Sequence, residues 1–207
     1  MTAGRFITFE GGEGSGKSTQ ASMLADWLQS RGKTVVVTRE PGGTPLGERI
    51  RELILSSRPA LVAEFLLFAA ARAEHVAARI VPALAGGNWV VCDRYIGSTR
   101  VYQGTRAGVD PSLIDVVEKH TSEAARPSLT FILDVPAATG CARASQRGHL
   151  NRYDAETLSY HDRIRQGFLD IAAREPARCT VIDGSRSAQE VADAVRETVS
   201  ARLGIGA

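Results

Sequence analysis

A glycine-rich loop near the start of the chain has the residue types and spacing that bind phosphate. The stretch Gly11-x4-Gly16-Lys17-Ser18 fits the pattern GxxxxGK[ST], follows the apolar run "RFITF" and precedes a helical pattern. Glycines let backbone N–H groups converge on an anion, and a helix N-terminus adds partial positive charge. We expect Lys17 to reach the terminal phosphates of ATP or GTP and Ser18 to ligate Mg²⁺. The predicted ATP-binding residues are Gly11, Gly12, Glu13, Gly14, Ser15, Gly16, Lys17, Ser18 and Thr19.

An acidic and a basic residue stand together at the end of the third apolar run. The run "WVVCDRY" (89–95) places Asp93 beside Arg94. Ligands of open parallel sheets bind beyond the carboxyl ends of the strands. We therefore expect Asp93 to hold the Mg²⁺ shell and Arg94 to bind a phosphate with its forked guanidinium. A plain Asp–Arg surface pair is the alternative.

The segment 141–154, "CARASQRGHLNRYD", is basic, polar and low in apolar residues. Its three arginines, Arg143, Arg147 and Arg152, suit a lid that supplies positive charge to a phosphoryl group in transfer. A solvated basic loop is the alternative. The pattern thus predicts a lid over the phosphate site.

Phe68, Arg72 and His75 follow the spacing i, i+4, i+7 and share one helix face. Phe68 is suited to stack on a base, and Arg72 to donate to a carbonyl or a phosphate. The alternative is that Phe68 belongs to the core while Arg72 and His75 are ordinary rim residues.

Alternating strands and helices must position these groups. The apolar runs are rich in Val, Ile, Thr and Phe and lack strict alternation, which is typical of strands buried on both faces of a parallel sheet. Helical patterns between them imply right-handed crossovers. The predicted fold class is α/β, a doubly wound five-stranded parallel sheet with helices on both faces, of the P-loop NTPase type. The five predicted strands lie within residues 5–10, 34–40, 89–95, 129–135 and 179–183.

Several local signals set the limits of the helices. A helix marked by Ala21, Leu24 and Leu28 should end near Gly32, and Pro82 should kink or end a long helical stretch, 61–85. Further signals are an apolar helix face of Leu46, Ile50, Leu53 and Ile54, Asp110 as N-cap before Pro111, and the capping-box pair Ser187 and Glu190.

The bulk properties indicate an ordinary globular protein. The 207 residues suit a single domain, 1–207, with the lid at about 141–154. We expect no membrane span and no secretory signal, hence a cytoplasmic protein. The three cysteines, Cys92, Cys141 and Cys179, are far apart, which predicts buried or incidental thiols. The net charge of +2 does not argue for nucleic acid.

The phosphate loop alone leaves several classes open. A GTPase should carry an NKxD motif, which the chain lacks. An ATP-driven motor or a DNA-processing ATPase stays open, although the chain is short for either. A small kinase fits best. A kinase for another nucleotide or a small alcohol, and an ATP-binding regulatory module without transfer, remain as alternatives.

Five segments taken in order resemble the bacterial thymidylate kinase (dTMP kinase) family over nearly the whole chain. They are "FITFEGGEGSGKSTQ", "VVTREPGGTPLGERIREL", "LLFAAARAEH", "VVCDRYIGSTRVYQG" and the arginine-rich lid. The resemblance implies transfer of the γ-phosphoryl group of ATP to dTMP with Mg²⁺, for dTTP synthesis. It also implies a homodimer, and no nucleic acid or membrane as partner.

The resemblance assigns roles to residues at the acceptor site. It implies that Glu13 meets the sugar 3′-hydroxyl and that Arg51 and Arg94 clamp the acceptor phosphate. It implies that Phe68 stacks on thymine and that Arg72 bonds its O4 edge. Further implied neighbours of dTMP are Pro41, Thr99, Tyr102, which crowds the sugar 2′ position, and Gln103.

The position of the arginines resembles one subtype of the family, in which they lie in the lid. The interior of the phosphate loop lacks an arginine, so the resemblance gives the catalytic cation to the lid, to Arg147 first and to Arg143 and Arg152 next. The departures from the family pattern are Gly97, Val101, Asn151 and Asp154. They concern the hinge of the lid and the sugar pocket, and none removes a phosphate contact.

Overall fold

Five strands form one parallel sheet in the order β2-β3-β1-β4-β5. The structure is a computed structural model and describes residues 4–105, 109–146, 148 and 152–205. Every strand lies within one of the apolar runs that predict it, so the expected sheet is confirmed. The strands are β1 (Phe6–Glu10), β2 (Val35–Arg39), β3 (Trp89–Asp93), β4 (Leu129–Asp134) and β5 (Cys179–Asp183).

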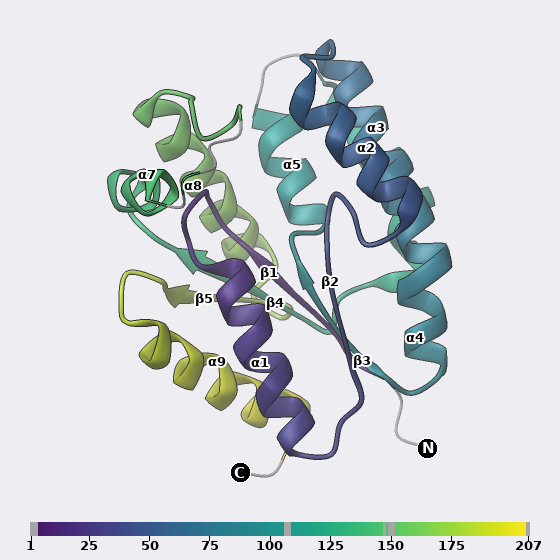
Figure 1. Ribbon diagram of the computed structural model, residues 1–207, viewed down its shortest axis with the longest axis vertical. Coiled ribbons are helices and arrows are strands. Elements are labelled where there is room, and N and C mark those ends of the chain that lie inside the picture. Colours follow the sequence, from purple (N-terminus) through teal and green to yellow (C-terminus); the bar gives the residue numbers. More distant parts are fainter. Residues whose placement is uncertain (1–3, 106–108, 147, 149–151, 206–207) are drawn as a thin grey trace.

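Helices cover both faces of this sheet (Figure 1). The side chains of Ile7 and Phe9 pack in a cluster with Leu24 and Val195, on the face covered by α1 and α9. Phe6 packs on the other face, in a separate cluster. The doubly wound arrangement is therefore confirmed. The α-helices are α1 (Lys17–Ser30), α2 (Pro45–Ser56), α3 (Leu61–His75), α4 (Val81–Ala85), α5 (Ile96–Thr105), α6 (Pro111–Ser122), α7 (Ala137–Ser145), α8 (Leu158–Arg174) and α9 (Ala188–Leu203).

Residues at the helix ends form the predicted caps. The Asp110 carboxylate accepts from the backbone N–H of Ser112 at 2.8 Å, with Pro111 opening α6. Ser187 and Glu190 form both bonds of a capping box at the start of α9. These side chains satisfy N–H groups that a helix start leaves without partners.

The long helical stretch 61–85 changes its winding before Pro82. A π-helical segment, Val76–Ile80, separates α3 from α4, and Pro82 lies in the first turn of α4. The missing N–H of Pro82 falls directly after the π-helical segment, where the winding already departs from the regular α-helical hydrogen-bond pattern. Among the described residues, no helix has the length and apolarity needed to cross a bilayer.

The strand register brings the chemical residues to one edge. Phe9 of β1 pairs with Asp93 of β3, and Arg39 of β2 also pairs with Asp93. The carboxyl ends of three neighbouring strands therefore meet, and the loops that follow them share one side of the sheet.

Candidate active site

A cavity of about 470 Å³ lies among the segments that follow β1, β2 and β3. The phosphate loop forms one part of its wall, and side chains of α2, α3 and α5 form another. Most of the predicted site residues therefore meet in one space. Those that line it are Glu13 to Thr19 of the loop, Pro41, Arg51, Phe68, Arg72, Asp93, Arg94, Thr99, Tyr102, Gln103 and Arg143.

Left-handed glycines shape the phosphate loop. Gly14 and Gly16 have φ angles of +68° and +89°, a region that favours glycine. The loop also lies against α7, because a Cβ on Gly14 would stand 2.0 Å from the carbonyl oxygen of Gly140. The glycines thus serve both the turn and a close backbone approach.

The Lys17 ammonium lies inside the loop. Its Nζ donates to the carbonyl oxygens of Gly11 at 3.1 Å and Gly12 at 2.7 Å, and to the Ser15 hydroxyl at 3.1 Å. Burial, with the nearby charge of Arg94, lowers the pKa of Lys17 to about 8. A phosphate beside this ammonium would favour its charged form.

Ser18 and Asp93 form the pair expected to hold a metal. The Ser18 hydroxyl donates to Oδ2 of Asp93. Oδ1 of Asp93 is buried and has no hydrogen-bond partner among the described residues. A hydroxyl and a carboxylate with a free buried oxygen are hard oxygen donors, which suit Mg²⁺ bound together with substrate phosphates. The described part of the chain has no group of three or more His, Cys, Asp or Glu side chains that could hold a metal alone.

Arg94 and Glu13 form a charged pair on the floor of the cavity. Nη2 of Arg94 lies 2.8 Å from Oε1 of Glu13, and the Tyr102 hydroxyl donates to the same oxygen at 3.1 Å. Burial acts to lower the pKa of Arg94, but Glu13, with Tyr102, Asp93 and Glu10, together outweighs it, and the pKa is raised. Arg94 also has a φ of +68°, a strained conformation for an arginine that typically occurs at functional sites.

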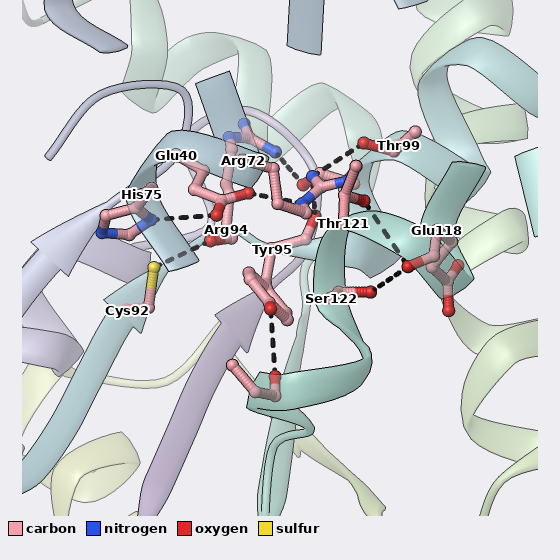
Figure 2. A network of polar contacts seen from close by, with 12 residues as sticks. Glu40, Arg72, His75, Cys92, Arg94, Tyr95, Thr99, Glu118, Thr121 and Ser122 are labelled. Atoms are coloured by element: carbon pink, nitrogen blue, oxygen red, sulfur yellow. Dashed lines mark hydrogen bonds and ion pairs between the residues drawn. The ribbon is translucent and has the colours of Figure 1, made fainter. Parts of the chain in front are cut away.

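A buried network fixes Arg72 at the inner end of the cavity (Figure 2). Its Nε donates to Oε2 of Glu40 at 2.8 Å, and its Nη2 donates to the Thr99 hydroxyl at 2.8 Å and to the carbonyl oxygen of Tyr95 at 3.2 Å. Oε1 of Glu40 lies 2.9 Å from Nδ1 of His75. The guanidinium is therefore held through Nε and Nη2. Its third nitrogen, Nη1, has no hydrogen-bond partner among the described residues.

His75 is not the rim residue that the alternative interpretation gave. It is fully buried, and its two ring nitrogens contact Glu40 and, at 2.6 Å, the Thr38 hydroxyl. Arg72 is buried as well, at 3% exposure. The rim alternative for Arg72 and His75 is therefore wrong, because both side chains are buried.

Arg51 adds a second cation beside the phosphate site. Its Nη1 donates to the carbonyl oxygen of Pro41 at 3.1 Å. Burial and the neighbouring charge of Arg39 lower the pKa of Arg51, and Arg94 acts in the same direction. Cations that repel one another across a cavity form a site for an anion.

The three lid arginines have different placements. Arg143 lines the cavity and donates to the carbonyl oxygens of Gly184 at 2.7 Å and Ser185 at 3.0 Å. Arg152 forms an ion pair with Glu64 of α3 and is not among the residues that line the cavity. Arg147 lies outside the described residues.

The structure shows the surroundings of two residues that depart from the family pattern, Gly97 and Val101. Gly97 leaves room for Glu10, because a Cβ there would stand 2.8 Å from its Oε1. That carboxylate accepts from the backbone N–H groups of Tyr95 and Ser98 at the start of α5. Val101 is buried in the cluster that contains Tyr102. Asn151 lies outside the described residues.

Sequence reasoning missed the buried carboxylates that hold the site side chains, Glu40 and Glu64. Glu40 follows β2 in "REPGG", and its place at the carboxyl end of a strand was the one available signal. Glu64 lies on α3 without any local pattern, and its contacts reach Gln103 and Arg152 far along the chain. Only the fold brings these residues together.

Comparisons with known proteins agree on one family. The family model described as thymidylate kinase matches residues 9–195. A thymidylate kinase of Bradyrhizobium sp. (strain ORS 278) is 49% identical over 206 residues, which cover 97% of this chain and 91% of that protein. A thymidylate kinase of Caulobacter vibrioides is 48% identical over 208 residues, covering 99% of this chain and all of that protein.

A solved structure agrees with these sequences. The crystal structure of thymidylate kinase from Ehrlichia chaffeensis matches with a TM-score of 0.78 and 37% identity, covering 95% of this chain and 99% of that one.

Proposed function

Because the chain belongs to the thymidylate kinase family, we propose that the cavity described above is its active site. The chain transfers the γ-phosphoryl group of ATP to dTMP, giving dTDP and ADP for dTTP synthesis. The observation that carries the site assignment is the shared cavity, which joins the phosphate loop to a pocket walled by Phe68 and Arg72.

The phosphate loop is our proposed donor site. Its backbone N–H groups and Lys17 bind the phosphates of ATP. Thr19 lies in the first turn of α1 and belongs to the same donor site. Ser18 and Asp93 would hold Mg²⁺, which when bound neutralises charge on the phosphate oxygens. The free buried oxygen of Asp93 supports this choice.

The rest of the cavity is the proposed acceptor site. Arg94 and Arg51 bind the phosphate of dTMP, and Glu13 accepts from the sugar 3′-hydroxyl. Glu13 already accepts from Tyr102, whose ring then stands at the 2′ side of the sugar. Positioned charges of this kind account for most catalysis in phosphoryl transfer.

The base would lie between Phe68 and the polar wall of α5. Phe68 stacks on the ring, Arg72 donates to O4, and Thr99 and Gln103 stand beside the base edge. Pro41 closes the pocket next to Arg51.

The lid, 141–154, supplies the remaining positive charge in this proposal. Arg147 is the first choice for the transferring phosphoryl, with Arg143 and Arg152 next. Arg143 already lines the cavity, while Arg152 must release Glu64 before it can reach a phosphate. Lids of this kind close on substrate and exclude water.

We propose one kinase domain, 1–207, that forms a homodimer in the cytoplasm, where its substrates are found. The partner face would be an apolar surface across α2, α3 and α6, called the apolar face below. Its exposed side chains are Leu53, Val62, Leu66, Leu113 and Val116. The acceptor is a single nucleotide, so we propose neither nucleic acid nor a membrane as a partner.

Release of ADP from Mg·ATP tests the substrate, with dTMP, dUMP, dCMP, dGMP, dAMP and shikimate offered separately. We expect fast turnover with dTMP and weaker turnover with dUMP, since one methyl group offers only ~1–3 kcal/mol of discrimination. Turnover with another acceptor but not dTMP would contradict the base pocket. Tight ATP binding without any turnover would favour a regulatory module.

A further inference from the structure

A buried carboxylate on α3 holds the side-chain amide of Gln103 in one orientation. Gln103 lies on α5 at 2% exposure, and its Nε2 donates to Oε1 of Glu64 at 3.0 Å. Glu64 is fully buried; the Tyr153 hydroxyl donates to its Oε1 at 3.1 Å and Arg152 pairs with its Oε2. A carboxylate paired with a guanidinium can only accept, so the amide nitrogen of Gln103 must face it.

This orientation decides what Gln103 offers to a ligand. Its Oε1 has no hydrogen-bond partner among the described residues, and the residue lines the cavity. Gln103 therefore presents an acceptor. Arg72 also lines the cavity, and its guanidinium can only donate hydrogen bonds. Its Nε and Nη2 bond to the protein, so Nη1 is the nitrogen available to a ligand.

A donor beside an acceptor distinguishes two kinds of pyrimidine. A pyrimidine-2,4-dione such as thymine or uracil carries a carbonyl oxygen next to a ring N–H. Cytosine carries an amino group next to a ring nitrogen without hydrogen, which is the reversed pattern. A site built for one pattern rejects the other strongly, because its buried polar groups are left unpaired.

We propose that Glu64 is a positioning residue that sets selectivity for a pyrimidine-2,4-dione over cytosine. It acts through Gln103, by turning the amide oxygen toward the base. The inference rests on the proposed function and adds to it the residue that determines how the base edge is read. Without Glu64, the Gln103 amide is free to flip and to offer its N–H₂ group to cytosine.

The decisive variant is Glu64→Met, which removes both acceptor oxygens while keeping the length of the side chain. We expect the ratio of kcat/KM for dTMP to kcat/KM for dCMP to fall by about tenfold, the effect of one misplaced hydrogen bond. Most of the loss with dTMP should appear in KM. Glu64→Gln should shift the ratio in the same direction by less, since it keeps one amide oxygen that can still accept from Gln103 but must share it with Tyr153 and Arg152.

A double-mutant cycle shows whether Glu64 acts through Gln103. Gln103→Leu removes the amide and should lower the same ratio. Glu64→Met should then change the ratio no further in the Gln103→Leu background, because the group through which it acts is gone. A merely structural role would give additive losses.

Arg152→Met is the matched control for the ion pair of Glu64. It breaks the ion pair but leaves the bond between Glu64 and Gln103. We expect the dTMP to dCMP ratio to stay at the wild-type value, whatever happens to kcat. A fall equal to that of Glu64→Met would mean that the ion pair, and not the amide, sets selectivity, and would overturn the inference.

A test on the wild-type enzyme covers the case in which the Glu64 variants do not fold. N3-methyl-dTMP has no ring N–H for the Gln103 oxygen, so we expect about tenfold or lower kcat/KM than for dTMP. Equal turnover of the two would overturn the inference. If the wild-type enzyme did not turn over dTMP at all, the proposed function would fail instead, which is a distinguishable result.

Discussion

At the scale of single residues, Lys17 is a cation in a place that disfavours cations. Its ammonium is buried within the phosphate loop, and burial with the Arg94 charge brings its pKa to about 8. Phosphate oxygens stabilise the protonated form, so the pKa must rise when nucleotide binds. ATP binding above pH 8 therefore takes up a proton.

The affinity for ATP should consequently depend on pH. Below pH 8, Lys17 is protonated in both states and its contribution is constant. As pH rises above 8, the free enzyme loses the proton and the Kd for ATP should increase by about tenfold per pH unit. Isothermal titration between pH 7 and 9.5 measures this. Lys17→Met should bind weakly at every pH, and a slope that survived in this variant would assign the effect to another group.

Glu40 is the anion on which both Arg72 and His75 depend. All three side chains are buried, and the carboxylate uses one oxygen for each partner. Removal of one member of a buried ion pair leaves the other charge without compensation and costs ~3–5 kcal/mol. The network thus ties base recognition to the stability of the fold.

Glu40→Gln should lower the free energy of unfolding by about 3 kcal/mol and raise the KM for dTMP more than it lowers kcat. The first effect follows from the unpaired charge of Arg72, and the second from loss of its fixed orientation. Urea unfolding and steady-state kinetics measure the two. Glu48→Gln, which affects an exposed ion pair with Arg39, is the matched control and should cost less than about 1 kcal/mol. Equal destabilisation in both variants would contradict the role of burial.

At the scale of elements, the regular parts of the fold could be predicted from the sequence alone. Each strand matches an apolar run. β1, β3 and β4 are buried along most of their length and are therefore rich in apolar residues, whereas the edge strands β2 and β5 leave Val37 and Val181 exposed. The caps Asp110 and Ser187 were equally visible, since capping depends on neighbours within three residues. Leu53 was expected on the buried face of its helix but is half exposed, because periodicity alone does not locate the edge of an apolar stripe.

The carboxylates that orient the site could not be predicted in this way. Glu64 meets Gln103 across 39 positions, and Glu40 meets Arg72 across 32. No local pattern encodes a pairing over such distances, which depends on how α3 and α5 pack. The same holds for the conformation of Arg94, which only the backbone reveals.

Helix α7 packs closely against the phosphate loop, and a single substitution can test this contact. A Cβ on Gly140 would stand 2.5 Å from the carbonyl oxygen of Glu13, closer than real Cβ contacts. Gly140→Ala should therefore push α7 away from the loop. We expect kcat/KM to fall by at least tenfold, because misplacement of ~1 Å at a site can cost about 100-fold.

Gly104→Ala is the matched control for this substitution. Gly104 is also a helical glycine, but a Cβ there would meet only Cδ1 of Ile114, at an ordinary 3.5 Å. Alanine in a helix is favoured over glycine by up to ~1 kcal/mol, so this variant should be as stable as the parent or more so. If Gly140→Ala proved equally harmless in turnover and thermal unfolding, the loop and α7 would not be mechanically linked.

At the scale of the whole molecule, the sheet separates two apolar clusters that support different parts of the cavity. One cluster, with Phe9 and Phe131 stacked at 5.2 Å between ring centroids, packs under α1 and α9 and holds the phosphate loop from below. A separate cluster on the other face contains Tyr102 and Tyr153, which line the cavity. Each cluster thus supports a different wall of the cavity.

The apolar face across α2, α3 and α6 remains exposed in the single chain. Leu66 and Val116 are 48% and 56% exposed, and the helices that carry them touch one another through α3. Exposed apolar side chains gathered on adjoining helices mark interaction surfaces. A second copy of the chain is the occupant we propose.

Leu66→Glu should convert the proposed dimer into a monomer, because it would bury a carboxylate of each copy in an apolar interface, which is costly for a charge. The side chain is half exposed in one chain, so the monomer should fold with unchanged helix content. Sedimentation velocity should give the mass of two chains for the parent and of one chain for the variant. Leu158→Glu changes an equally exposed leucine of α8, outside the apolar face, and should stay dimeric. A parent that sediments as one chain would refute the dimer, and a dimeric Leu66→Glu variant would move the interface elsewhere.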